Sequence, residues 1–173
     1  MPVVIHDADL VRVQGVNRRV AELPATDLEE HGVPAFATVL ETLPPGFFLD
    51  VELKEDVVAQ VVQLLVRLRG DPPGNTVISS FLPAALSRVR AAAPSWPTWL
   101  LHERLDPVVI EQARMLGCRG IAAEWPALSA STIGLTRAAG LELMTWTLPN
   151  RAVRDEVLLL GLDAVCVDPE ALP

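Results

Sequence analysis

The chain has 173 residues, 50% of them hydrophobic, which is enough for one domain with a substantial apolar core. Its net charge of -8 at pH 7 argues against a nucleic-acid-binding surface, because phosphate backbones are bound by clustered Lys and Arg side chains. No stretch approaches the roughly 18 consecutive apolar residues of a membrane span, and we expect one domain over residues 1–173.

The amino-terminal segment begins with a short apolar run. Pro2 to Asp7 ends in a polar pair, which predicts a strand whose carboxyl end delivers His6 to a site. After it we predict a polar loop over residues 8–19, a short helical turn over 23–30 with Thr26 or Asp27 as its cap, and an apolar helix over 34–43 that ends at Pro44, Pro45 and Gly46.

The run from Phe47 to Lys54 predicts a strand, because aromatic and β-branched residues fill its first half. Side chains two positions apart share a face, so Asp50, Glu52 and Lys54 point one way. The apolar side chains point the other way: Leu49, Val51 and Leu53. Two carboxylates and an ammonium group on one face indicate a wall of an active site, and a solvated edge strand is the alternative.

The rest of the chain alternates helices with short apolar strands. The predicted helices cover residues 56–69, 83–93, 107–116, 129–139 and 151–160, and the predicted strands cover 76–81, 99–101, 120–125, 141–148 and 164–168. Such alternation predicts a parallel sheet of βα units. Polar or aromatic residues stand at the carboxyl ends of the predicted strands: His6, Lys54, Phe81, Trp125, Trp146 and Asp168.

This placement favours an α/β fold of the TIM-type (β/α) barrel class, in which the site is built at the carboxyl ends of the strands. An open doubly wound sheet is the alternative. Its nucleotide-binding forms usually carry a Gly-rich turn after the first strand, and no such motif occurs in this sequence.

Two residue types are used sparingly. Lys54 is the only Lys among the 14 basic residues, and a compact ammonium group suits the binding of a phosphate oxygen.

Cys118 and Cys166 match no metal-binding spacing, so we expect buried thiols in a reducing compartment. Because no basic segment with a following apolar run opens the sequence, a cytoplasmic location is expected.

Five ordered pieces of the chain resemble the glycerophosphodiester phosphodiesterase family. They are Val4–Asp7, Leu49–Lys54, Ile78–Phe81, Thr145–Asn150 and Gly161–Pro169. The resemblance runs along the whole chain and implies a TIM-type barrel. It also implies an enzyme of lipid metabolism that hydrolyses small-molecule glycerophosphodiesters to glycerol 3-phosphate and an alcohol with a divalent metal ion, Mg²⁺ or Ca²⁺.

The resemblance further implies roles for individual residues. His6 matches a catalytic histidine that acts as general acid or base, and an imidazole exchanges protons near neutral pH. Glu52 matches a metal ligand, and Lys54 matches a phosphate-contacting residue. The apolar walls around the glycerol moiety are matched by Phe81 and Trp146.

One part of the family pattern is missing. A strand ending in His-Arg-Gly and a strand with a Glu-x-Asp pair should precede the first piece, but only five residues precede His6. We therefore expect the first one or two strands of the barrel to be absent. Glu52, helped by Asp50, is then the remaining candidate ligand for a cation that prefers oxygen ligands.

Three explanations stay open for this departure. The start of the enzyme lies outside the sequence, or the chain is a non-catalytic relative that binds a phosphate ligand or a partner. In the third, a neighbouring chain, such as a second copy in a homo-oligomer, covers the open edge of the barrel. For the 173 residues alone we expect little or no activity.

Overall fold

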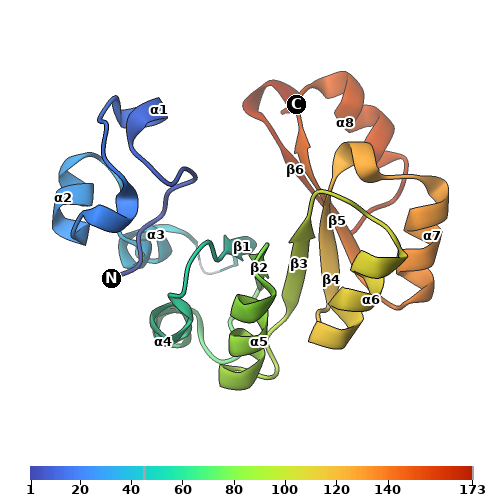
Figure 1. The fold of residues 1–173 in the computed structure, drawn as a ribbon, viewed down its shortest axis with the longest axis horizontal. Helices are drawn as coiled ribbons and strands as arrows, with labels where there is room; N and C mark the ends of the chain where they lie inside the picture. Colours follow the sequence, from blue (N-terminus) through green and yellow to red (C-terminus); the bar gives the residue numbers. More distant parts are fainter. Residues whose placement is uncertain (45, 173) are drawn as a thin grey trace. The chain divides into compact units, whose positions relative to one another are not determined.

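A computed structural model describes residues 1–44 and 46–172, and the chain divides into two compact units. Unit 1 consists of Met1–Phe48 and Val57–Asn75. Unit 2 consists of Leu49–Asp56 and Thr76–Pro173. Among the described residues, every strand of the sheet lies in unit 2 (Figure 1). The expectation of one domain over the whole chain stays a prediction.

Unit 2 is built on a parallel sheet of six strands. They are β1 (Leu49–Glu52), β2 (Thr76–Ser80), β3 (Thr98–His102), β4 (Gly120–Glu124), β5 (Glu142–Leu148) and β6 (Ala164–Val167). The spatial order is the order along the chain, as in a barrel, whereas a doubly wound sheet reverses direction at a switch point. All five neighbouring pairs are parallel, and the register is irregular between Thr145 and Leu148 of β5.

Four helices of unit 2 follow the strands in alternation. They are α5 (Pro83–Ala92), α6 (Pro107–Leu116), α7 (Ala130–Ala138) and α8 (Arg151–Leu158), and short 3-10 turns cover Trp125–Ala127 and Pro169–Ala171. Figure 1 shows α6, α7 and α8 on the same side of β4, β5 and β6. The side chains of Asp106, Ser129 and Asn150 accept hydrogen bonds from the first turns of α6, α7 and α8, which fixes where these helices begin.

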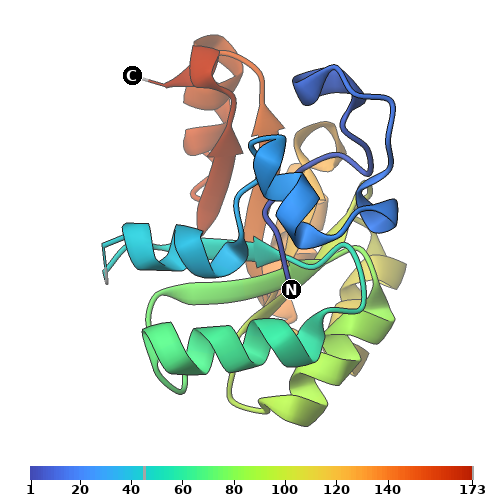
Figure 2. The same ribbon diagram turned by 90° about the vertical axis from the view of Figure 1, so that its left-hand side faces the viewer.

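The main core of unit 2 lies between the sheet and these helices. Its buried residues come from both layers and include Leu86, Leu100, Val109, Ile121, Ile133 and Leu143. The opposite, inner face carries a smaller apolar cluster of Val77, Trp99, Leu101, Ala122 and Met144. In Figure 2, β2 and β6 point in clearly different directions, which is the accumulated twist of a sheet that curls toward a barrel.

The predicted fold class is thereby confirmed as an α/β parallel sheet of the TIM type. The described residues hold six strands, whereas a closed barrel of this type has eight. No helix among residues 1–44 and 46–172 is both long and apolar enough to cross a bilayer.

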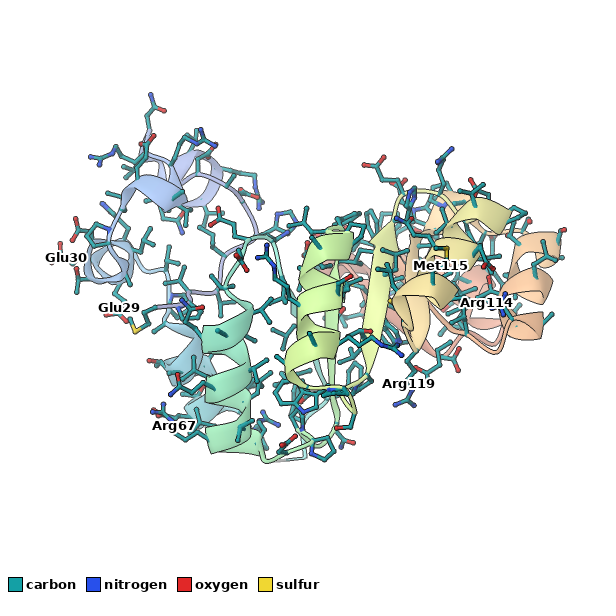
Figure 3. The ribbon with its side chains drawn as sticks, turned by 60° about the horizontal axis from the view of Figure 1, so that its bottom comes forward. Glu29, Glu30, Arg67, Arg114, Met115 and Arg119 are labelled. Atoms are coloured by element: carbon teal, nitrogen blue, oxygen red, sulfur yellow. The ribbon has the colours of Figure 1, made fainter. Side chains whose placement is uncertain are left out.

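Unit 1 is helical. It contains α1 (Val11–Gln14), a 3-10 turn (Val20–Glu22), α2 (Ala25–Glu30), α3 (Phe36–Thr42) and α4 (Val58–Arg69). Helix α4 is amphipathic, with Val58, Val61 and Leu65 buried and basic residues in its last turn, where the helix dipole favours them. Arg67, labelled in Figure 3, is one of these basic residues. A second small core consists of Leu10, Leu28 and Val33.

Three predictions for unit 1 are wrong. Residues 2–7 form no strand, because Val3 makes only an isolated antiparallel bridge with Ala35, and Val3 and Ile5 pack on the small core around Leu10. The predicted loop after them contains α1. Neither Thr26 nor Asp27 caps α2, whose N-cap residue is Pro24. The apolar residues of the first run thus serve a local core and no sheet.

Two further predictions need correction. The strand predicted from Phe47 begins only at Leu49, and Phe47 and Phe48 are about half exposed, at 53% and 52%. Cys118 is buried as expected, but Cys166 is exposed, because it lies on β6 at the open edge of the sheet. The other predicted helices and strands occur within a few residues of their expected bounds. Pro45 of the predicted helix stop lies outside the described residues.

Candidate functional site

The carboxyl end of β1 presents the predicted charged residues on one face. Leu53 faces the other way and is 2% exposed, which confirms the predicted alternation. The Nζ atom of Lys54 lies 2.8 Å from Oε1 of Glu52. Both side chains are partly exposed, at 38% and 29%, so each remains accessible to a ligand. The only lysine of the chain therefore forms an ion pair with Glu52.

Asp50 lies on the same face as Glu52, two positions earlier on β1. The residue is exposed by surface area, but protein atoms surround its carboxyl group closely, and this desolvation raises its pKa to about 6. The nearby Ser79 hydroxyl lowers the pKa of Asp50, and the Glu52 charge raises it further. Ser79 is fully buried, and its Oγ forms no hydrogen bond of good geometry with any atom of the described residues.

Ser80 fixes the backbone around this end of the sheet. Its Oγ donates to the carbonyl oxygen of Leu53 at 2.6 Å and accepts from the backbone N–H of Leu82 at 3.0 Å. The backbone N–H of Leu53 also donates to the carbonyl oxygen of Ser79 at 2.8 Å. These bonds hold the segment before Lys54 against the turn that carries Phe81. The sequence prediction missed Ser79 and Ser80, although two hydroxyl residues at the end of an apolar strand are a usable signal.

The two predicted apolar walls contact each other. The rings of Phe81 and Trp146 meet edge to face, with centroids 5.6 Å apart and planes at 82°. The indole N–H of Trp146 donates to the carbonyl oxygen of Ala122 at 3.0 Å, which fixes the orientation of its ring. Phe81 is 43% exposed, so the pair presents an apolar surface at the carboxyl edge of the sheet.

The far edge of the sheet faces the same region. Cys166 is exposed by surface area, but protein atoms close to its thiol desolvate it and raise its pKa; the Thr147 hydroxyl lowers this pKa, and the charges of Asp50 and Asp168 raise it. Cys166 is on β6 and Asp50 is on β1, so the charge of a residue on one edge strand influences the thiol on the other. At the opposite end of the sheet Arg119, which is labelled in Figure 3, forms an ion pair with Glu142.

His6 belongs to a separate cluster in unit 1. Its Nδ1 lies 2.7 Å from Oδ1 of Asp7, and Arg12 donates to both carboxylate oxygens of Asp7, from Nε at 2.6 Å and from Nη2 at 3.0 Å. The Arg12 guanidinium, followed by His6, holds the pKa of Asp7 well below its usual range, and Asp7 raises the pKa of Arg12. Asp7 and Arg12 were not predicted as site residues, and His6 lies on a loop and not at a strand end.

The metal prediction has support from two carboxylates. Asp50 and Glu52 share a face and repel each other, which is the arrangement that a cation relieves. Among residues 1–44 and 46–172, however, no three His, Cys, Asp or Glu side chains are grouped as a metal site.

The sheet and its charged edge define a protein of the TIM-barrel class. The model of the glycerophosphoryl diester phosphodiesterase family matches residues 1–170. The chain belongs to this family, whose members are enzymes. No curated protein matches the chain.

Three solved structures share the fold. A phosphodiesterase from Oleispira antarctica, in complex with the product sn-glycerol-3-phosphate, has a TM-score of 0.87 at 21% identity, over 98% of this chain and 76% of its own. A glycerophosphodiester phosphodiesterase from Agrobacterium tumefaciens has a TM-score of 0.78 at 21% identity, and the match covers 98% of this chain and 78% of that one. A glycerophosphodiester phosphodiesterase from Parabacteroides distasonis has a TM-score of 0.77 at 18% identity, and the match covers 97% of this chain and 74% of that one. At these identities the likeness establishes the fold.

Proposed function

We propose that the chain is a metal-dependent phosphodiesterase that hydrolyses glycerophosphodiesters to glycerol 3-phosphate and an alcohol. The observation that supports it best is the pairing of chemistries at one edge of the sheet. The Glu52–Lys54 ion pair lies at the carboxyl end of β1, and the Phe81–Trp146 ring pair lies at the carboxyl end of β2 and near that of β5. A phosphate group needs cationic donors, and the carbon skeleton of glycerol needs an apolar surface.

Glu52 and Asp50 are the proposed ligands of the divalent cation. Two carboxylates suit Mg²⁺, which usually keeps several waters and binds one or two protein carboxylates, and they suit Ca²⁺ less well. When bound, the cation supplies Lewis-acid stabilisation of charge on the phosphoryl oxygens. Lys54 binds a phosphate oxygen as a point charge, and its ion pair with Glu52 holds the ammonium group near that position. The family resemblance assigns the proton transfer to His6.

Because little or no turnover is expected of the 173 residues alone, the test is release of glycerol 3-phosphate from glycerophosphocholine, with Mg²⁺ or Ca²⁺ present, by a form extended with the family's His-Arg-Gly and Glu-x-Asp strands. Glu52→Gln should lower turnover at least about a hundredfold, since a lost ligand removes several kcal/mol of charge stabilisation. The variant should stay folded, because a partly exposed ion pair contributes only about 0–1 kcal/mol to stability. Glu55→Gln removes the same charge three residues later and should stay within about twofold of wild type. Equal turnover of all three proteins would defeat the proposal.

A second function, binding of a phosphate ligand without turnover, is favoured by one observation. Within the described residues no third candidate metal ligand joins Asp50 and Glu52. In that case glycerol 3-phosphate or inorganic phosphate should raise the melting temperature while no product forms. At a ligand concentration of 100 times Kd, binding stabilises the folded chain by about 2.7 kcal/mol. Lys54→Ala should abolish this shift. Turnover by the wild-type chain excludes the binding-only function.

Two other expectations stay predictions. The edge strands β1 and β6 each have one sheet neighbour, and a second copy that pairs with such an edge would give a dimer in sedimentation analysis. A cytoplasmic location is tested by fractionating cells and following the protein.

A further inference from the structure

A three-residue cluster on unit 1 was not anticipated from the sequence. His6 contacts the carboxylate of Asp7 through Nδ1, and the guanidinium of Arg12 binds both oxygens of the same carboxylate. Asp7 is well covered, at 21% exposure, whereas the His6 side chain is 80% exposed. The rest of the imidazole ring, with Nε2, therefore faces away from Asp7 and toward solvent.

The loop that carries the cluster is held in place by its neighbours. Leu10 is fully buried in the small core of unit 1, and its backbone N–H donates to the carbonyl oxygen of Arg18 at 3.0 Å. The backbone N–H of Val20 donates to the carbonyl oxygen of Ala8 at 3.0 Å. Since these bonds flank the loop, Asp7 and Arg12 are positioned by packing and not only by their mutual attraction.

The charge of Asp7 fixes the donor in its contact with His6. Because Arg12 keeps the pKa of Asp7 low, the carboxyl group is ionised and can only accept hydrogen bonds. Nδ1 of His6 must then carry the proton, which leaves the lone pair of the neutral ring on Nε2.

We propose that Asp7 is a positioning residue that holds His6 in the Nδ1–H tautomer, so that Nε2 acts as a general base, with Arg12 orienting the Asp7 carboxylate. The catalytic part of this inference rests on the proposed phosphodiesterase function. Nε2 accepts a proton from the attacking water molecule, whose oxygen bonds to phosphorus, and the Asp7 charge stabilises the resulting imidazolium. The alcohol leaves with the electron pair of the broken P–O bond and takes a proton from water. The imidazolium then returns its proton to solvent.

The chain contains its own reference for this test. His102 accepts a hydrogen bond at Nδ1 from the backbone N–H of Arg104 at 2.9 Å, so its proton must lie on Nε2. His6 and His102 are therefore expected in opposite tautomers. Nitrogen-15 correlation spectra of the two imidazoles, recorded at a pH where both rings are neutral, distinguish the tautomers directly.

The wild-type spectrum alone tests the assignment. The Nδ1–H form for His6 and the Nε2–H form for His102 support it, and the Nε2–H form for His6 overturns it. In Asp7→Ala, His6 should shift toward the Nε2–H form while His102 does not change. Asp9→Asn removes a neighbouring charge but preserves the bond that Asp9 accepts from Val11, and it should leave His6 unchanged. Persistence of the Nδ1–H form in Asp7→Ala overturns the role of Asp7.

Kinetics of the form extended by the two missing strands test the catalytic part separately. Asp7→Ala should lower kcat about tenfold or more with little change in KM, because the substrate-binding residues are untouched and only the proton acceptor is disturbed. An unchanged kcat, or a loss that Asp9→Asn shares, overturns the general-base role. If the extended wild-type form shows no turnover, the proposed function and the general-base role fail together, whereas the tautomer spectra of the 173-residue chain still decide whether Asp7 positions His6.

Discussion

Gly120 lies where three chain segments approach too closely for a side chain. A Cβ atom at this position would be 2.6 Å from the carbonyl oxygen of Glu142, 2.8 Å from its Cβ, and 2.8 Å from Cδ1 of Trp99. Ordinary contacts begin at 3.4 Å, so the neighbours would have to withdraw by up to 0.8 Å. The register explains the crowding, because Gly120 is paired with Trp99 on β3 and with Glu142 on β5.

Gly120→Ala should therefore destabilise the sheet. Overpacking costs about 1–3 kcal/mol, and withdrawal of Trp99 weakens the 3.1 Å bond from its indole N–H to the Glu142 carboxylate, which contributes about 1.5 kcal/mol or more. The sum is about 3 kcal/mol. At about 2–4 °C per kcal/mol for a chain of this size, the melting temperature should fall by about 6–12 °C.

Thermal unfolding monitored by circular dichroism measures the effect, with Gly134→Ala as the matched control. Gly134 lies inside α7, and a Cβ there would meet nothing within 4 Å. Alanine should stabilise this helix by about 0.5–1 kcal/mol. A Gly120→Ala variant that melts at or above the wild-type temperature would refute the close approach of Trp99, Gly120 and Glu142.

Two carboxylates should give opposite pH dependences in thermal unfolding without divalent metal. Burial raises the pKa of Asp50 from 3.8 to about 6. As pH rises, Asp50 therefore ionises in the unfolded chain before it ionises in the folded chain, and the stability falls between about pH 4 and pH 6. Asp50→Asn should remove this fall, and an unchanged profile would contradict it. The N–H of Val109, followed by other donors, lowers the pKa of Asp106, so its contribution is present above pH 3.8 and is lost as pH falls further. Asp106→Asn should reduce this loss of stability at acid pH. A loss as steep as that of wild type would contradict the role of the Asp106 carboxylate as the cap of α6.

The alternation of elements in unit 2 could be predicted because it depends on local patterns. Apolar strands and amphipathic helices of the right lengths specify a parallel βα sheet wherever their partners lie. The same is true of β1, where the two-residue period alone places Asp50 and Glu52 on one face. The identity of the family also followed from short motifs along the chain.

The run before His6 shows where local patterns fail. A strand and an extended segment that packs on a small core have the same apolar composition, so the sequence could not distinguish them. Only the packing of Val3 and Ile5 near Leu10 decided between them. The exposure of Cys166 was undetermined for the same reason, because a strand pattern does not say whether the strand lies at a sheet edge.

The sequence by itself determined the family and the candidate residues of the site, and the tertiary structure decided which of these candidates meet. Phe81 and Trp146 are separated by 65 positions, and their contact depends on the register of the three strand pairings between β2 and β5. The choice of Glu52 as the partner of Lys54 and the support of His6 by Asp7 and Arg12 depend on side-chain conformations. Such contacts are set by packing in three dimensions, which no periodicity along one strand encodes.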